Sequence, residues 1–215
     1  MATTNHRTAR RRVDARSSVE RITAAGRTVL GRGEASLEQI AAEAGVGIAT
    51  LYRHFPNREA VVRAVLEDIL DTDLLPLVER AADAPDTRGA LQDIATRLLD
   101  LITEERGLVT FAGNFADVAL DVLLRFSASL QPLLERAQQA GEIRSDLTAE
   151  DIPHFLVMAV AGLALPGAAP SLRARFVALL FDSLNPAAAT PLPPLRVDEI
   201  GEDGLRTTLG NVTRG

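Results

Sequence analysis

The spacing of apolar residues constrains this chain more than any other feature, because they recur three and four positions apart along most of its 215 residues. That spacing places apolar side chains on one face of an α-helix. No stretch shows the strict alternation of apolar and polar residues that is typical of a half-buried strand. We therefore predict an all-α fold with about nine helices.

Helix start and stop signals divide the first third of the chain. Ser36 and Gln39 fit a capping box, in which side chain and backbone of the two residues bond reciprocally. Gly45 suits the end of that helix, and Asn57 suits the start of another. We expect helices over residues 17–31, 36–45 and 48–55, and a fourth from residue 58 towards Leu75, which Pro76 should end or kink.

The rest of the chain also shows helical periodicity until its composition changes near residue 186. Further helices are expected over residues 86–105, over 110–140 with Pro132 as a kink or break, from Thr148 onward, and over 171–184 with Ser171 as the cap. A Pro-rich segment then begins a stretch with few apolar residues, which predicts a flexible tail. The predicted organisation is a basic flexible arm (1–16), a helix-turn-helix domain (17–60), a helical domain (61–185) and a C-terminal tail (186–215).

The net charge of −6 hides an asymmetry between the two ends of the chain. Residues 1–60 contain ten arginines against six acidic residues, whereas residues 61–215 contain thirteen arginines against twenty-three acidic residues. A basic front on an acidic body indicates that only the front meets a polyanion. Short windows also fluctuate by this much, so the charge alone leaves the question open.

Composition excludes several classes of protein. The absence of cysteine rules out disulfides, cysteine–zinc sites and thiol catalysis. His6, His54 and His154 are far apart in sequence, so we predict neither a metal site nor a cofactor. No apolar run approaches the roughly 20 residues that span a bilayer, and no apolar segment follows the basic N-terminus. We therefore expect a cytoplasmic protein that is not inserted in a membrane.

Residues 36–55, SLEQIAAEAGVGIATLYRHF, predict a helix, a glycine turn and a second short helix. This arrangement delivers the second helix into the major groove of DNA in helix-turn-helix proteins. The second helix then needs an apolar face for the core and a polar face for the DNA. Leu51 and Phe55 can supply the first face, and residues 50 and 52–54 can supply the second.

The segment GVGIATLYRHFPNREAVVRAV resembles the DNA-binding signature of the TetR family of transcriptional repressors. The resemblance extends over residues 18–66 without gaps, and Gly47 and Ile48 depart from the residues that are usual in the family. The segment from Ala140 to Leu147 also resembles a region of the C-terminal domain in this family. The resemblance implies an N-terminal three-helix DNA-binding domain and a C-terminal helical domain for ligand binding and dimerisation.

The resemblance also implies which residues contact DNA. Thr50 and Arg53 are candidates for contacts with base edges, although Arg53 could instead reach only phosphate. Ile48 suits an apolar contact with a thymine methyl group, and Tyr52 and His54 suit backbone contacts combined with core packing. The predicted DNA-binding set is Ser36, Gly47, Ile48, Thr50, Tyr52, Arg53, His54 and Arg58.

Two further sets of residues follow from the resemblance, and ordinary core packing is the alternative for both. Residues where the family places its ligand cavity are Phe111, Asn114, Phe115, Asp117, Phe126, His154 and Met158. Residues on the last two helices that would pair with a second copy of the chain are Leu156, Val160, Leu163, Leu172, Phe176 and Leu180.

These expectations combine into one functional hypothesis. The chain is predicted to be a homodimeric repressor that binds a palindromic operator in double-stranded DNA and leaves it when a small-molecule effector binds. A protein-interaction module or an activator with the same fold is the alternative. An enzyme is not expected, because the sequence lacks a phosphate loop, an HExxH motif and a Ser–His–Asp order, although Asp117 and Asp121 share a helix face.

Overall fold

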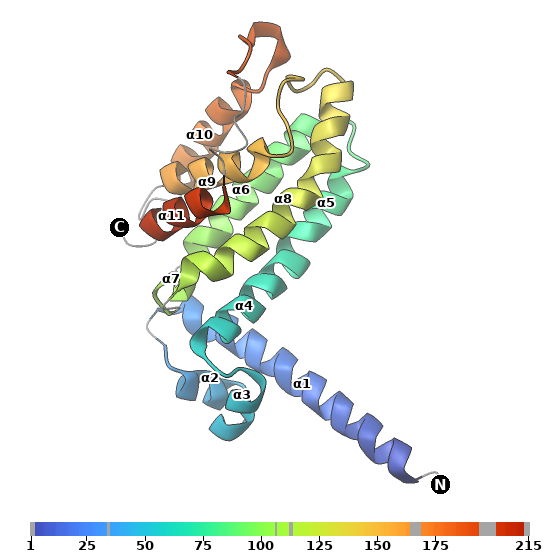
Figure 1. Cartoon of the computed structure of the whole chain (residues 1–215), viewed down its shortest axis with the longest axis vertical. Coiled ribbons are helices and arrows are strands. Elements are labelled where there is room, and N and C mark those ends of the chain that lie inside the picture. Colours follow the sequence, from blue (N-terminus) through green and yellow to red (C-terminus); the bar gives the residue numbers. More distant parts are fainter. Residues whose placement is uncertain are drawn as a thin grey trace. The chain divides into compact units, whose positions relative to one another are not determined.

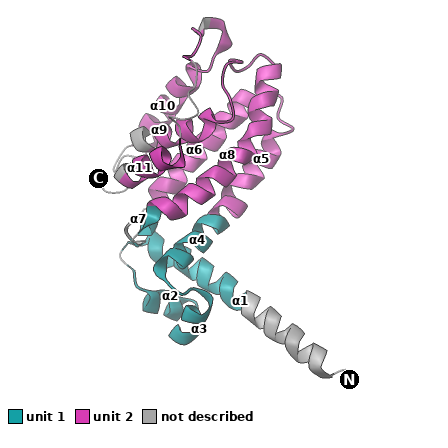
Figure 2. Ribbon diagram, viewed as in Figure 1, with its two compact units in different colours: residues 1–68, 105–115 teal, residues 69–104, 116–215 magenta. Residues whose placement is uncertain are grey.

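The computed structural model describes residues 3–33, 35–105, 107–111, 114–163, 169–193 and 201–212. Every regular element in these ranges is helical, which confirms the all-α prediction (Figure 1). The chain forms two compact units, and Figure 2 shows them in different colours. The first contains residues 1–68 and 105–115, and the second contains residues 69–104 and 116–215.

The first unit contains four helices and most of a fifth: α1 (Thr3–Gly31), α2 (Leu37–Glu43), α3 (Ile48–His54), α7 (Gly107–Phe111) and the larger part of α4 (Arg58–Ile69). The flexible arm expected over residues 1–16 is wrong for the described backbone, since α1 is helical from Thr3 onward. Neither proline nor glycine occurs between residues 3 and 25, and alanine and arginine are good helix formers, so nothing stops the helix there.

Local signals in α2–α4 behave as predicted. The Ser36 hydroxyl accepts a hydrogen bond from the Gln39 N–H at 3.2 Å, and the Gln39 side chain accepts one from the Ser36 N–H at 2.8 Å. Gly45 has a φ of +64°, which L-residues with a side chain rarely adopt. The Asn57 side chain accepts a bond from the Ala60 N–H at 2.8 Å at the start of α4. These contacts define where each short helix begins and ends.

Apolar residues from α1–α4 form the core of the first unit. Ile22, Ile40, Leu51 and Val62 have no solvent exposure. The short helix α7 comes against the end of α1 at Gly107, where an added Cβ would lie 1.7 Å from the Leu30 carbonyl oxygen. Because only glycine permits that approach, Gly107 places the rest of α7 within this unit.

The second unit contains the remaining elements: η1 (Leu70–Leu74), α5 (Leu75–Ala81), α6 (Thr87–Glu104), α8 (Phe115–Gln139), α9 (Asp151–Leu163), α10 (Pro170–Asp182), η2 (Pro186–Ala188) and α11 (Glu202–Val212). Helix α6 packs against α5, α9 and α10, and α9 packs against α11. One core cluster joins Leu99, Leu134, Ile143, Val177 and Phe181. This cluster brings together α6, α8, α10 and the segment that follows α8.

Proline residues have different effects in the two long helical runs. The run from α4 into α5 widens into the π-helical turn η1, whose following residue Leu75 donates to the Leu70 carbonyl. Pro76 lacks an N–H and crowds the carbonyl of the preceding turn, and the wider turn relieves both problems. Pro132 lies inside α8, which remains one helix of 25 residues, so the predicted alternative of a break is wrong.

The unit boundary differs from the domain boundary expected after residue 60. Val61, Val62 and Val65 of α4 are buried within the first unit, which therefore extends to Asp68 and also contains Glu105–Phe115. The predicted cap at Ser171 is wrong, because α10 begins at Pro170 after the N-cap Ala169 and makes no side-chain cap bond. Proline suits the first helical position, since its missing N–H has no partner there.

The C-terminal segment contains a helix that the sequence analysis did not predict. In α11, Leu205 and Leu209 are buried against Ala116, Leu120 and Val157. Arg206 also pairs with Asp117 at 2.6 Å. The helical pattern in the sequence is short here, because it consists of two leucines four residues apart between two glycines. Before this helix, Leu192 is 40% exposed, and Leu195 and Ile200 lie outside the described residues.

Candidate nucleic-acid interface

Helix α3 has two chemically different faces. Leu51 and Phe55 anchor it, with 0% and 6% of their surface exposed. Ile48 is 37% and Tyr52 is 47% exposed, and Arg53, on the side away from these anchors, is exposed as well. Seven residues make two turns of helix. Burial of one side of α3 therefore leaves its polar side exposed to a partner.

The turn between α2 and α3 sets the direction of helix α3. The Val46 N–H donates to the Ala41 carbonyl at 3.0 Å, and the Thr50 N–H donates to the Gly47 carbonyl at 2.8 Å. Gly47 is the N-cap of α3 but has no side chain to bond the first-turn amides. The N–H groups of Ile48 and Ala49, which precede Thr50 in the first turn, therefore receive no such cap and can meet an outside acceptor such as a phosphate oxygen.

Ser36 holds the start of α2 and also acts on a neighbouring carboxylate. A bond from the backbone N–H of Glu38 and a bond from the Ser36 hydroxyl lower the pKa of Glu38, and the Arg58 guanidinium adds a smaller effect in the same direction. Glu38 is therefore a negative group close to Arg58. It reduces the attraction of this edge of the unit for anions, so the positive charge of Arg58 is partly balanced.

Arg58 stands at the start of α4, where the sequence analysis expects a phosphate contact. Its guanidinium lies over the ring of Phe111, 5.1 Å from the ring centre, and such a cation–π contact is worth about 0.5–1 kcal/mol at exposed sites. Phe111 was predicted in the ligand set, but it is buried in the first unit on α7. Arg58 and Phe111 are 53 residues apart in the chain, so no local sequence pattern could predict their contact.

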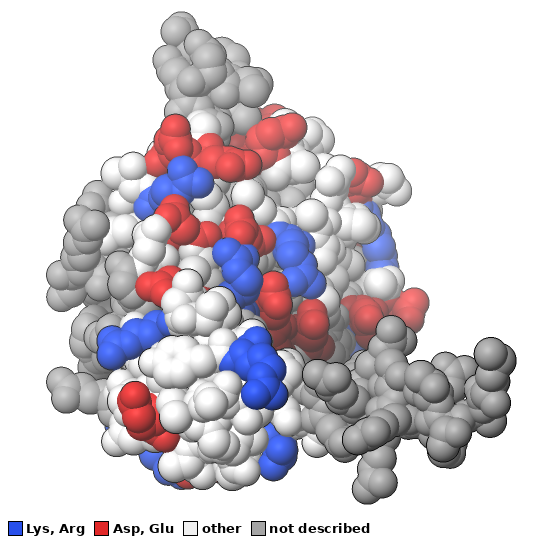
Figure 3. Space-filling view, turned by 60° about the horizontal axis from the view of Figure 1, so that its bottom comes forward, with Lys and Arg blue, Asp and Glu red and all other residues white. Residues whose placement is uncertain are grey.

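The arginines of the first unit divide into exposed and structural ones. Arg21, Arg53 and Arg58 are exposed. Arg27 instead pairs with Glu105 at 2.9 Å and with Asp68 at 3.8 Å. Figure 3 faces the surface of α2 and α3, where arginine and acidic side chains border a largely uncharged area. An uncharged centre with basic neighbours suits a surface that reads bases and holds the phosphates around them.

The seven residues of the predicted ligand set do not come together. Asn114 is exposed, Met158 is 62% exposed, and Phe126 is buried in the core. The Nδ1 atom of His154 lies 3.1 Å from the Glu150 carbonyl oxygen. Asp117 is paired with Arg206, and Phe115 is half-buried at the start of α8. Eleven residues separate Phe115 from Phe126 on one straight helix, which corresponds to roughly 16 Å. The ligand set therefore spans two units and several faces of α8 and α9.

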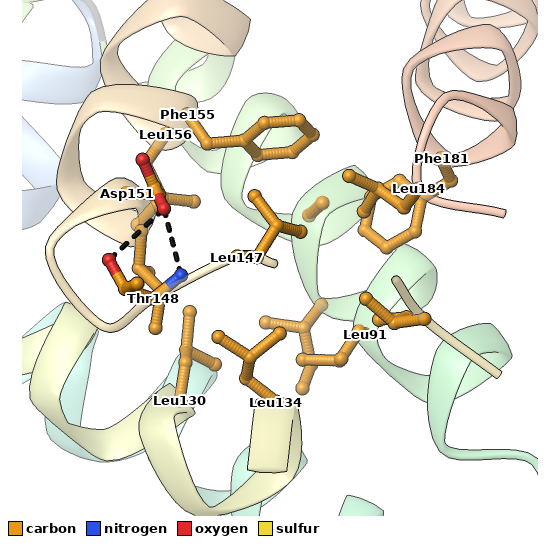
Figure 4. A pocket seen from close by; sticks show the side chains of 14 residues that line it. Leu91, Leu130, Leu134, Leu147, Thr148, Asp151, Phe155, Leu156, Phe181 and Leu184 are labelled. Carbon is orange, nitrogen blue, oxygen red and sulfur yellow. Dashed lines mark hydrogen bonds between the residues drawn. The ribbon is translucent and has the colours of Figure 1, made fainter. Parts of the chain in front are cut away.

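The second unit nevertheless contains an apolar cavity of about 80 Å³ (Figure 4). Leu91 of α6, Leu130 and Leu134 of α8, and Phe155 of α9 lie around it. None of the seven residues predicted to bind a ligand lines this cavity. Leucine and isoleucine are common throughout the sequence, so only the tertiary arrangement could identify those that surround the hollow.

The predicted dimer set divides between an exposed face and the interior. Leu172 and Phe176 of α10 are 45% and 42% exposed, and Leu180 and Val160 are half-buried. Leu156 faces the cavity instead, so its expected outward position is wrong. The side chain of Leu163 lies outside the described residues. Leu179, which was not predicted, extends the exposed apolar face of α10.

Two kinds of site are absent from the described part of the chain. No group of three or more histidine, cysteine or acidic side chains is arranged to hold a metal ion. None of the described helices combines the length and the apolar character needed to cross a membrane.

The geometry thus defines a helix-turn-helix unit and a second helical unit with an apolar cavity. Residues 22–65 match the family model described as bacterial regulatory proteins of the tetR family. Residues 86–186 match the model described as the C-terminal domain of SbtR-like transcriptional regulators. The chain belongs to the TetR family of transcriptional regulators. A comparison with curated proteins gives no match.

Solved structures agree with this assignment. The TetR transcriptional regulator SCO0520 from Streptomyces coelicolor is 30% identical, with a TM-score of 0.57, and the match covers 79% of this chain and 99% of that one. RolR in complex with resorcinol is 16% identical, with a TM-score of 0.61 and coverage of 91% and 94%. FadR from Bacillus subtilis in complex with stearoyl-CoA is 15% identical, with a TM-score of 0.60 and coverage of 77% and 96%. The last two show similarity of fold alone.

Proposed function

We propose that this TetR-family regulator is a dimeric repressor that binds a palindromic operator and leaves it when a small molecule occupies the second unit. The observation that carries the proposal is the two-faced helix α3. Leu51 and Phe55 hold it in the core, and Ile48, Tyr52 and Arg53 are exposed to a partner. A helix held in this way at a helix-turn-helix suits the major groove, which is wide enough to admit it.

The DNA contacts that we propose have separate roles. Arg53 and Thr50 read base edges, and Ile48 contacts a thymine methyl group. Tyr52, His54 and Arg58 reach the phosphate backbone, together with the helix starts at Ser36 and Gly47. Arg58 can exchange the Phe111 ring for a phosphate, because the cation–π contact is weak at an exposed position.

Dimerisation is supported by the apolar face of α10. Leu172, Phe176 and Leu179 are spaced four and three residues apart, so they share one face, and all three are exposed. Met158 of α9 is exposed as well. Apolar surface of this kind marks a protein–protein contact, and a second copy of the chain would cover it. A two-fold dimer then matches an inverted repeat with half-sites roughly 34–36 Å apart.

The cavity favours the ligand-responsive regulator over the alternative of a ligand-independent interaction module or activator. A solid second unit would leave no space for an effector, whereas this unit contains an apolar hollow. RolR and FadR, which share the fold, are described with resorcinol and stearoyl-CoA bound, respectively. DNA binding and release would take place in the cytoplasm, in keeping with a bacterial regulator.

The decisive test is selection of binding sites from a random pool of duplex DNA, followed by anisotropy titration of the selected duplex at several salt concentrations. We expect an enriched inverted repeat that one dimer binds, with a steep loss of affinity as salt rises. A scrambled duplex of the same composition is the control. Binding without sequence preference would refute the operator proposal and favour the interaction module.

A further inference from the structure

Helix α11 connects two helices of the second unit that are far apart in sequence. Its leucines, Leu205 and Leu209, are buried. They form one cluster with Ala116 and Leu120 of α8 and with Val157 of α9. Figure 1 shows α11 beside α9, against which it packs. Helix α11 therefore joins the middle of α9 to the first turns of α8.

Helix α9 also forms one wall of the apolar cavity. Its residues Ile152, Phe155 and Leu156 line the hollow. Empty space supplies no atoms for these side chains to contact, so they lose van der Waals attraction on that side. The next residue, Val157, is turned about 100° further round the helix and lies under α11. Contacts with α11 consequently contribute more to holding α9 than they would in a solid core.

Helix α11 is weak by its own sequence. It has eleven residues, and isolated helices shorter than about 12–15 residues are marginal in water. Gly204 and Gly210 lower its helix propensity further. Arg206 pairs with Asp117 of α8, but both side chains are partly exposed, so this ion pair adds little. Burial of the two leucines is therefore the main contact that holds α11, and little free energy is needed to release it.

The volume of the cavity means that a larger guest requires one wall to move outward. The cavity has a volume of about 80 Å³, whereas an apolar cavity of about 150 Å³ holds benzene. Helices α6 and α10 are joined by a buried cluster that includes Leu99 and Val177. Ile152 and Phe155 of α9 are only partly buried against the same cluster. Helix α9 is therefore the wall that can move most easily.

We propose that α11 is a latch that holds α9 over the cavity, and that release of α11 lets the cavity expand to hold an apolar guest. Docking of α11 and binding of the guest then compete, so each weakens the other by the same factor. The proposal rests on the proposed function, since it assigns regulation to the cavity that the effector would occupy. Helix α11 lies after residue 186, where the match to the C-terminal family model ends, so the latch belongs to a part of the chain outside that match.

A titration of the full-length protein with benzene, followed by NMR of the leucine methyl groups, tests the latch. Replacement of both Leu205→Ala and Leu209→Ala removes the side chains that dock α11. This double variant should bind benzene at least about tenfold more tightly than the unmodified chain, because a competing state is no longer populated. Thr208→Ala, at an exposed position of α11, is the matched control and should bind benzene as the unmodified chain does. Equal affinity of the double variant and the unmodified chain would overturn the proposal.

The same spectra show where benzene binds. In the double variant, the methyl groups of Leu130 and Leu134, which line the cavity, should shift on addition of benzene. Leu123 and Leu124 pack against the cluster under α11 and should shift much less. Shifts confined to Leu123 and Leu124 would mean that benzene occupies only the surface that α11 has left, and would overturn the expansion of the cavity.

Hydrogen exchange measures the hold on α9 without any guest. In the double variant, amide exchange in α9 should accelerate at least about tenfold, since local opening of this helix becomes easier. Exchange in α5, which neither lines the cavity nor belongs to the α11 cluster, should stay unchanged. Unchanged exchange in α9 would show that α11 does not hold this helix.

Gly204→Ala tests the latch in the opposite direction. A Cβ added at Gly204 meets no atom within 4 Å, and alanine favours a helix more than glycine does, so α11 should become more stable. Benzene affinity should therefore fall about twofold to fivefold relative to the unmodified chain. An unchanged or higher affinity would overturn the proposal, even if the double variant failed to fold.

A parallel titration with the selected operator separates the latch from the proposed function, because benzene binding is measured without DNA. If the operator is bound but benzene affinity is the same in the double variant, the latch fails and the repressor stands. If the double variant binds benzene more tightly but no duplex is bound, the latch stands and the repressor fails. If benzene lowers operator affinity more in the double variant than in the unmodified chain, both are supported.

Discussion

Helices α3 and α10 both expose one face, but they expose opposite kinds of side chain. On α3 the outer face contains Tyr52 and Arg53, with Thr50 half-buried beside them. On α10 the large exposed apolar residues are Leu172, Phe176 and Leu179. The backbone geometry is the same in both helices, so the difference in partner comes from the side chains alone. A polar, basic face suits DNA, whereas an apolar face suits a second copy of the chain.

The comparison extends to how each face is supported. Helix α3 is seven residues long and depends on a glycine turn and a buried leucine for its position. Helix α10 has thirteen residues and is anchored by Val177 and Phe181 in a larger core. Short helices are marginal by themselves, so α3 should be more sensitive to the loss of local contacts than α10. Four predictions test these differences.

The largest effect is expected at the centre of the apolar face of α10. Phe176→Asp places a charge in the proposed dimer contact, where loss of a central aromatic residue costs roughly 2–4 kcal/mol. The dimer dissociation constant should therefore rise about 30-fold or more. Analytical ultracentrifugation over a concentration series measures this change.

A control variant keeps that test specific to α10. Leu192→Asp places the same charge at another exposed leucine, outside α10, and should leave the dimer intact. If the Phe176→Asp variant formed a dimer as stable as that of the unmodified chain, the apolar face of α10 would have a partner other than a second copy of the chain. The comparison of α3 and α10 as two binding faces would then fail.

A smaller effect is expected at the basic face of α3 and the start of α4. Arg53→Ala should cost about 1–3 kcal/mol on the selected operator and relax the preference at one base pair. Arg58→Ala should weaken all duplexes similarly and reduce the salt slope by about one, because it removes a phosphate contact. Anisotropy titrations on the operator and on single-base variants distinguish the two patterns. Identical behaviour of the two variants would contradict the separation into base-reading and phosphate-binding residues.

The next effect concerns the local support of the first unit. Ser36→Ala removes the hydroxyl that caps α2 and should lower the free energy of unfolding by about 1 kcal/mol. Chemical denaturation followed by circular dichroism gives the value. Ser145→Ala, at an exposed position between α8 and α9, is the control and should change stability little. If the two variants lost the same stability, the capping box would not be what holds α2.

The smallest effect is a difference in acid sensitivity between the units. A bond from the Arg144 side chain, followed by one from the Leu192 N–H, holds the pKa of Asp146 far below its usual range. The pKa of Glu38 in the first unit is also lowered. A carboxylate with a depressed folded-state pKa contributes stability above its unfolded pKa, near 4, and the contribution is lost as pH falls through the folded value.

Replacement of each carboxylate separates their contributions. Between pH 6 and pH 2, Asp146→Asn should lose less stability than the unmodified chain, because it has no such contribution to lose. Glu38→Gln should flatten the profile less, since its pKa shift is the smaller one. Thermal unfolding at a series of pH values measures both. A profile unchanged by Asp146→Asn would show that the Arg144–Asp146 pair adds nothing to stability.

The helix-turn-helix could be predicted residue by residue because its signals are local. The capping partners Ser36 and Gln39 are three residues apart, and Gly45 marks a backbone turn that other residues resist. The seven predicted ligand residues, by contrast, were assigned from family position without knowledge of how the helices turn. A rotation of one helix by a single residue moves each side chain by about 100°. Phe111 of the ligand set lies in the first unit, and Leu156 of the dimer set faces the cavity, so both have surroundings different from those expected.

The sequence by itself determined the helical class, the position of α3 and the apolar spacing of α10, because each depends on contacts within a few residues along the chain. Tertiary structure alone decided where the cavity lies, that Arg58 stacks on Phe111 and that α11 covers Ala116 and Leu120. These features join residues that are tens of positions apart, or depend on which face a helix presents. Apolar side chains of similar shape can satisfy many such arrangements, so their pairing is set by how the helices fit together rather than by residue type.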